Sequence, residues 1–202
     1  MLITDVTLQK KNSQRVNLYL DGEFAFALSL NVAADEKLKK GKEISPAELL
    51  ELKERATAAD AKKKAYDYLG RRAHSKAELL QKLRRSEKTR DGAKAALAEL
   101  ESFGYLDDSQ YAEMMAKHLS AKGYGEKKIR YELKAKGVED EIVEQIVADI
   151  PENTYEKIQK ILEKKYPQGI SNEKEKRRAV NLLVRYGYTL QEIFKVLGGE
   201  FE

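Results

Sequence analysis

Roughly the first thirty residues alternate polar and apolar positions with a period of two, which predicts β-strands because successive side chains of a strand face opposite sides. Three runs follow this pattern: Leu2, Thr4, Val6 and Leu8; Val16, Leu18 and Leu20; Phe24, Phe26 and Leu28. Asn12-Ser13 and Asp21-Gly22 separate the runs and are predicted to form turns, the second a tight hairpin. The pattern therefore predicts a small three-stranded antiparallel β meander, with a helix covering one face.

After about residue 45 the apolar positions recur with the period of an α-helix. Three boxes of Ser or Thr followed three residues later by Glu predict helix starts at Ser45, Ser75 and Thr189. Glycines follow the helical runs and are predicted to adopt a left-handed C-terminal cap; they are Gly104, Gly123, Gly137 and Gly187.

The helical part repeats itself, which decides the predicted fold. Tyr66, Tyr111 and Tyr155 begin comparable segments spaced 45 and 44 residues apart. A second landmark is a pair of apolar residues four apart, which occurs as Leu79 and Leu83, Ile129 and Leu133, and Ala179 and Leu183. Each repeat is predicted to hold three helices: about 60–73, 76–86 and 90–102; 108–122, 126–136 and 139–149; 154–165, 172–186 and 190–197. Such repeats bury their apolar faces by stacking, so we expect a mainly α fold whose tandem three-helix repeats form an elongated, curved array.

These patterns divide the chain into four predicted parts. They are a β meander (1–45), a linker helix with repeat 1 (46–107), repeat 2 (108–152) and repeat 3 (153–202).

Charge is distributed unevenly among the predicted helices. The chain has 38 Lys and Arg against 34 Asp and Glu, a net charge of only +4. The middle helix of every repeat is nevertheless basic, whereas the third helices of repeats 1 and 2 are neutral or acidic. Equivalent helices of a stacked array lie on one side, so we expect a basic stripe suited to a polyanion or an acidic protein groove. Solvation of exposed helix faces is the alternative, and it suffices for any single helix.

Composition argues against several functional classes. The absence of cysteine excludes disulfides and thiol chemistry, and it fits a cytoplasmic protein. No apolar run is long enough for a membrane span, and no signal peptide pattern begins the chain. His74 and His118 fall one repeat apart and are not expected to share a site. No cofactor, metal site or catalytic residue is predicted, because nothing combines a base, a nucleophile and an oxyanion donor.

The aromatic residues have two possible roles. The chain has eleven tyrosines and no tryptophan. Stacking on nucleic-acid bases is one role, and packing in the core with a hydrated hydroxyl is the other and the commoner one. We therefore expect the helix tyrosines, Tyr66, Tyr68, Tyr111 and Tyr155, to pack in the core.

Several phrases of the chain resemble the RecX family of recombination regulators. Ala65–Leu69 followed by Arg72–Leu79 is similar to the opening motif of that family. Leu97–Ala112 (LAELESFGYLDDSQYA) resembles its "L..L…GYLDD..YA" signature, and Gly123–Gly137 resembles its "G…I..EL..KG" phrase. The resemblance is strong over residues 60–150 and looser beyond, where the middle helix is longer.

The resemblance implies a non-enzymatic regulator of the RecA recombinase. RecX proteins bind the helical groove of the RecA–DNA filament, inhibit strand exchange and ATP hydrolysis, and block filament growth. A monomer with no membrane partner is expected. Docking would use basic side chains of the middle helices and their flanks: Arg71, Arg72, Lys76, Arg84, Arg85, Lys127, Lys128, Arg130, Lys134, Arg177 and Arg178. The alternative is a non-specific DNA-binding repeat protein that acts by competing for DNA.

Overall fold

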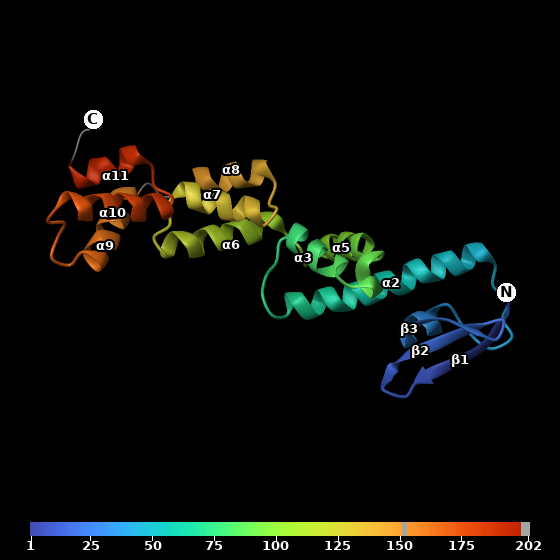
Figure 1. Ribbon diagram of the computed structural model, residues 1–202. Coiled ribbons are helices and arrows are strands. Elements are labelled where there is room, and N and C mark those ends of the chain that lie inside the picture. Colours follow the sequence, from blue (N-terminus) through green and yellow to red (C-terminus); the bar gives the residue numbers. More distant parts are fainter. Residues whose placement is uncertain (151–152, 199–202) are drawn as a thin grey trace. The chain divides into compact units, whose positions relative to one another are not determined.

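The computed structural model describes residues 1–150 and 153–198 (Figure 1). The chain divides into two compact units, Met1–Leu106 and Asp107–Glu202. The predicted fold class is confirmed, since tandem three-helix domains follow an N-terminal three-stranded antiparallel sheet. The predicted curvature of the whole array stays a prediction.

The sheet is a meander in the order β1-β2-β3. Its strands are β1 (Ile3–Gln9), β2 (Asn12–Leu20) and β3 (Glu23–Ser29). The hairpin at Asp21-Gly22 is confirmed, with positive φ at both residues (51° and 93°), as a tight turn of this kind requires. The predicted turn at Asn12-Ser13 is wrong. Gln9 pairs with Asn12, so the two-residue connection is Lys10-Lys11 and Asn12 already belongs to β2.

Helices cover one face of the sheet. They are the short α1 (Leu30–Asp35) and the long α2 (Pro46–Leu69), which lies beside the strands in Figure 1. The buried cluster joins both layers and includes Ile3, Leu18 and Leu28 from the strands and Leu52 and Ala56 from α2.

Helix α2 is a single 24-residue helix and corrects the predicted boundary near residue 60. Ser45 starts it with the predicted capping box, in which the Ser45 hydroxyl accepts from the Glu48 amide and the Glu48 carboxylate accepts from the Ser45 amide. No proline or glycine interrupts residues 47–69, so the predicted linker helix runs directly into the first helix of repeat 1. The helix ends at Leu69, four residues before the predicted end.

Repeat 1 continues with α3 (Lys76–Arg84), α4 (Glu87–Arg90) and α5 (Ala93–Ser102). The third helix, predicted over 90–102, begins only at Ala93, and the short α4 before it was not predicted. Gly92 lies directly against α2, because a Cβ built there would be 2.2 Å from the Ala58 amide nitrogen. The core of repeat 1 includes Ala65 from α2 together with apolar residues of α3 and α5: Leu79, Leu83, Leu97 and Leu100.

The C-terminal unit holds repeats 2 and 3, and its helices follow the predicted ranges to within one residue. They are α6 (Asp108–Ala121), α7 (Glu126–Ala135), α8 (Asp140–Ala148), α9 (Thr154–Lys165), α10 (Glu173–Arg185) and α11 (Leu190–Leu197). The predicted glycine caps at Gly104, Gly123, Gly137 and Gly187 are confirmed by positive φ. The capping box at Thr189 is also present, and the Ser75 hydroxyl caps α3.

Of the two sequence landmarks of the repeats, the apolar pairs mark one buried position, whereas the tyrosines do not. All six residues of the apolar pairs on the middle helices are fully buried: Leu79, Leu83, Ile129, Leu133, Ala179 and Leu183. The tyrosine landmark does not mark one core position. Tyr111 is 7% exposed, whereas Tyr66 is 38% and Tyr155 51% exposed, so core packing is wrong for the latter two. The Tyr66 ring packs edge-on against Tyr105 instead.

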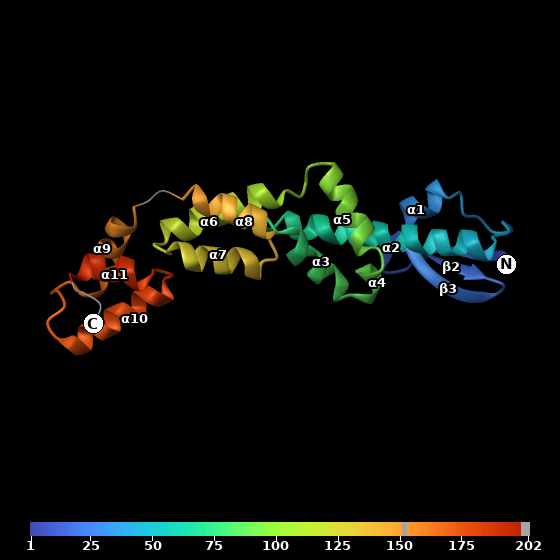
Figure 2. The same ribbon diagram turned by 90° about the horizontal axis from the view of Figure 1, so that it is seen from above.

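Repeats 2 and 3 meet through a close backbone approach. The Gly125 amide donates to the Tyr186 carbonyl at 2.8 Å, and the buried Tyr188 hydroxyl donates to the Gly123 carbonyl at 2.7 Å. A Cβ at Gly187 would be 2.4 Å from the Lys128 amide nitrogen. Glycine is therefore needed here for space as well as for its φ of 93°. Figure 2 shows the same elements in a second view.

Candidate basic docking surface

The middle helices place their basic side chains opposite a buried apolar edge. In α3, α7 and α10 the fully buried residues recur four apart, so the remaining positions of each helix face outward. The N-termini of α3 and α10 are held by side-chain caps, with Ser75 accepting from the Glu78 amide and Asn172 from the Glu175 amide. The predicted basic faces of these helices therefore lie away from the core, with Lys127, Arg177 and Arg178 exposed and Lys128 and Arg130 half-buried.

In α3 and the segment before it, some of the predicted cations form ion pairs and others do not. Arg72 forms an ion pair with Glu78 at 2.6 Å, and Lys76 forms one with Glu101 of α5 at 2.7 Å. Arg71, Arg84 and Arg85 are exposed and have no acidic partner in the part of the chain that the structure describes.

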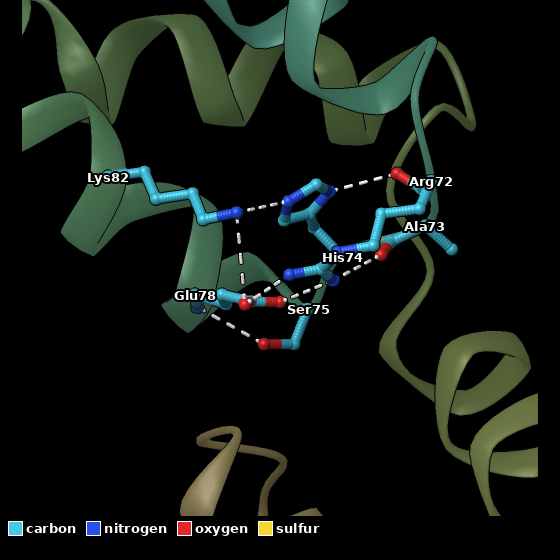
Figure 3. Close-up of polar contacts among 6 residues, drawn as sticks. All are labelled: Arg72, Ala73, His74, Ser75, Glu78 and Lys82. Carbon is cyan, nitrogen blue, oxygen red and sulfur yellow. Dashed lines mark hydrogen bonds and ion pairs between the residues drawn. The ribbon is translucent and has the colours of Figure 1, made fainter.

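His74 lies at the centre of a polar network at the start of α3 (Figure 3). Its ring is buried, with Nδ1 2.9 Å from the Arg72 carbonyl and Nε2 2.6 Å from Lys82 Nζ. A neutral ring with the proton on Nδ1 donates to that carbonyl and accepts from the ammonium. Burial is the main cause that lowers the pKa of His74 and keeps the ring neutral. The arrangement fixes the chain entering α3 and explains His74 as a structural residue.

Helix α7 is mostly engaged with acids of its own repeat. Lys128 pairs with Glu132 at 2.6 Å, Arg130 with Glu144 at 3.0 Å, and Lys134 with Asp140 at 2.9 Å. Arg130 also pairs with Glu126.

The pKa shifts agree with these contacts. The hydrogen bond from Arg130 lowers the pKa of Glu144, and the reverse contact raises the pKa of Arg130. Of the four predicted docking residues on α7, only Lys127 lacks an acidic partner among the described residues.

Tyr131 adds an exposed aromatic ring to α7. Its side chain is 65% exposed, and the Lys128 ammonium lies 5.1 Å from the ring centroid. On α10, Arg177 and Arg178 are exposed and form no ion pair with a described residue. The ring and these cations therefore face solvent.

The predicted stripe is thus divided between two kinds of cation. The six that form no ion pair within 4 Å among residues 1–150 and 153–198 are called the free cations below: Arg71, Arg84, Arg85, Lys127, Arg177 and Arg178. The other five are held in ion pairs within the chain: Arg72, Lys76, Lys128, Arg130 and Lys134. Three of the free cations lie in the N-terminal unit and three in the C-terminal unit. The structure therefore brings free cations together only within each unit.

Sequence reasoning missed a second basic surface. Lysines of α6 and α9 line a groove between repeats 2 and 3, and none of them was among the predicted docking residues. The signal was present as a run of lysines in α9, which includes Lys157, Lys160 and Lys164. Nothing in the described part of the chain groups three His, Asp or Glu side chains in a way that could hold a metal ion.

Comparison with known proteins identifies the family. Family models match residues 1–45 (regulatory protein RecX N-terminal domain), 61–100 (RecX, first three-helix domain) and 107–146 (RecX, second three-helix domain). The regulatory protein RecX of Clostridium acetobutylicum is 30% identical over 202 residues, covering 96% of this chain and 94% of the relative. The chain belongs to the RecX family.

Other RecX proteins extend the similarity. The Bacillus licheniformis protein is 30% identical and matches 96% of this chain and 76% of its own length. The Lactobacillus delbrueckii subsp. bulgaricus protein is 35% identical over 164 residues, which is 60% of its length.

Solved RecX structures share the fold. A crystal structure of regulatory protein RecX superposes with a TM-score of 0.69 at 21% identity and covers 98% of this chain and 99% of that one. RecX from Lactobacillus salivarius superposes with a TM-score of 0.60 at 20% identity, over 70% of this chain and 95% of that one. The family makes this chain a regulatory protein. Among its described helices, none has the length and apolar character that crossing a bilayer requires.

Proposed function

We propose that this RecX protein is a non-enzymatic regulator that binds the groove of the RecA–single-stranded DNA filament and inhibits RecA ATP hydrolysis, strand exchange and filament growth. Family membership supports the regulatory role. The observation that carries the docking proposal is the adjacent pair Arg84 and Arg85, exposed at the end of α3 with no acidic partner among the described residues.

The free cations suit docking better than the paired ones on energetic grounds. A cation already held in an ion pair must exchange one acid for another, so its net gain on binding is small. A free cation such as Arg84 or Lys127 forms its first ion pair on binding, and an arginine can bind a carboxylate with two parallel hydrogen bonds. Because free cations occur on both units, several modest contacts along a filament would add up to useful affinity.

A second candidate, direct non-specific DNA binding, is favoured by Tyr131. An exposed ring beside lysines is the arrangement on which single-stranded bases stack without sequence preference. In that case the effect on RecA would come from competition for DNA, and affinity for bare DNA would fall steeply with salt.

The deciding experiment is ATP hydrolysis by RecA on single-stranded DNA at near-physiological salt, with this protein added well below one copy per RecA. The test variant is Arg84→Glu/Arg85→Glu. The matched control is Lys39→Glu/Lys40→Glu, which changes the charge equally at two exposed lysines of the loop before α2.

We expect the wild type and the control to inhibit at substoichiometric concentration and the test variant to need about tenfold more protein or beyond. Equal inhibition by all three proteins would refute docking through Arg84 and Arg85. Inhibition that begins only when the wild type coats the DNA, and that a Tyr131→Ala variant loses, would establish the DNA-competition mechanism instead.

A further inference from the structure

The C-terminal unit contains a groove that the free cations do not form. It has a volume of about 950 Å³ and lies between repeats 2 and 3. Residues of α6, the end of α8 and the length of α9 line it, together with Tyr186 after α10. Its walls therefore come from segments far apart in the sequence that pack within one compact unit.

Lysines dominate the rim of this groove. Six line it, two from α6 and its end and four from α9: Lys117, Lys122, Lys157, Lys160, Lys164 and Lys165. Among the described residues of the lining, two acids join them, Glu113 and Asp149, and Glu113 is already paired with Lys117 at 3.4 Å. The other five lysines have no acidic partner in the described part of the chain. The described part of the rim thus carries an excess of positive charge.

Lys157 is the innermost of these lysines. Its ammonium donates to the Ser120 hydroxyl at 2.8 Å, which links α9 to α6, and burial lowers the pKa of Lys157. A half-buried ammonium whose only described contact is a neutral hydroxyl retains donors for an incoming carboxylate.

The floor of the groove is apolar. Ala116 and Ile161 are buried in it, and the half-buried Ile146 and Ile150 line it from α8 and its end. Gly123 also lines the groove, and a Cβ there would be 3.3 Å from Ile161 Cδ1. An occupant therefore meets hydrocarbon along the centre and ammonium groups at both edges.

We propose that this groove binds an acidic, amphipathic polypeptide segment of a partner protein, seated as a helix with its apolar side chains on the isoleucine floor and its carboxylates against the lysine rim. Helix-in-groove recognition combines these two features. The inference goes beyond the proposed function, since it requires neither RecA nor DNA and concerns residues outside the predicted docking set.

The lining favours a polypeptide over a nucleic acid. Proteins that bind single strands combine basic residues with aromatic stacking platforms. Among the lining residues that the structure describes there is no arginine, and the one aromatic residue, Tyr186, already packs against Tyr124 with ring centroids 5.1 Å apart. Lysine is a point charge without the fork geometry of arginine, and four apolar side chains would gain nothing from a sugar–phosphate chain.

Binding of a designed peptide to the full-length protein tests the proposal. The probe is a fluorescein-labelled peptide of about 15 residues with leucines at i, i+3, i+4 and i+7 and glutamates elsewhere. A scrambled peptide of the same composition keeps the charge but destroys the apolar face. A thymidine oligonucleotide of matched charge serves as the nucleic-acid competitor.

Two charge-reversal variants localise the binding. Lys160→Glu/Lys164→Glu alters exposed lysines of the rim, and Lys174→Glu/Lys195→Glu makes the same charge change on exposed lysines of α10 and α11 that do not line the groove. The isoleucine methyl signals give an independent readout: those of Ile146 and Ile150 should shift, whereas that of the fully buried Ile129 should not.

We expect fluorescence anisotropy to show binding of the amphipathic peptide, weakened about tenfold or more by Lys160→Glu/Lys164→Glu and less than about threefold by the control. Three results would each overturn the proposal: no binding of the amphipathic peptide, equal binding of the scrambled peptide, or stronger binding of the oligonucleotide at the same methyl groups. The last result would make the groove a nucleic-acid site.

Discussion

Repeats 2 and 3 pack closely at Gly187. Replacing this residue by alanine should destabilise that contact for two reasons, backbone strain and steric overlap. Its φ is 93°, a conformation that strains residues with a Cβ. In addition, the new methyl would be 2.4 Å from the Lys128 amide nitrogen and 2.5 Å from the Lys128 Cβ. Gly169 offers a matched control, because its φ of 82° is similar and nothing lies within 4 Å of a Cβ built there.

The magnitudes follow from this comparison. A left-handed residue with a Cβ costs roughly 1–2 kcal/mol, and this is the whole expected effect of Gly169→Ala. At Gly187 the overlap with backbone adds about 1–3 kcal/mol for a methyl forced into a filled space. Gly187→Ala should therefore destabilise the contact between repeats by about 2–5 kcal/mol.

Hydrogen exchange gives the most local measurement. The Gly125 amide is protected by its bond to the Tyr186 carbonyl across the two repeats. Because the overlap adds about 1–3 kcal/mol at Gly187 alone, the exchange of this amide should accelerate about 5- to 150-fold more in Gly187→Ala than in Gly169→Ala. If the two variants exchange equally fast at Gly125, the close approach at Gly187 contributes nothing and the reasoning is wrong.

Two further predictions concern the N-terminal unit. Ser45→Ala should lower the free energy of unfolding by about 1 kcal/mol in urea titrations because it removes the cap of α2, whereas Ser86→Ala should have little effect because Ser86 makes no side-chain cap bond to α4. The pKa of His74 lies below its ordinary value of 6.5 in the folded chain, so the unfolded state takes up a proton first as the pH falls. The contribution of His74 to the free energy of unfolding should therefore be constant above the unfolded pKa and should decrease as the pH falls from about 6.5 to the lower folded pKa. The urea midpoint of His74→Gln should lack this decrease. A decrease of equal size in that variant would contradict the assignment.

Local sequence signals predicted the elements well where each signal is contained in one helix or strand. The apolar pairs of the middle helices, the caps at Ser45 and Thr189 and the hairpin at Asp21-Gly22 were all correct. The errors arose where contacts from elsewhere decide the outcome. Helix α5 begins later than predicted, directly after the close approach of Gly92 to α2. The first turn lies at Lys10-Lys11 because strand pairing extends to Asn12.

The candidate site shows the same limit. Recurrence of basic residues on three middle helices was visible in the sequence, but the partners of Lys76, Arg130 and Lys134 are acids of neighbouring helices. Periodicity assigns a residue to a face of its own helix and says nothing about which side chains an adjacent helix brings within 4 Å. The lysine groove was missed for this reason too, because two repeats must pack before it exists.

Helix α2 contributes to two apolar clusters at once, with Leu52 and Ala56 in the core of the sheet and Ala65 in the core of repeat 1. A helix propagates order along its length, because each added residue costs less than starting a new turn. Melting the sheet would deprive the first half of α2 of its packing and shorten the segment on which repeat 1 is assembled. The sheet and repeat 1 should therefore open together as one cooperative unit, and the hydrogen-bonded amides in the interior of α2 should report the same opening free energy in both halves of the helix.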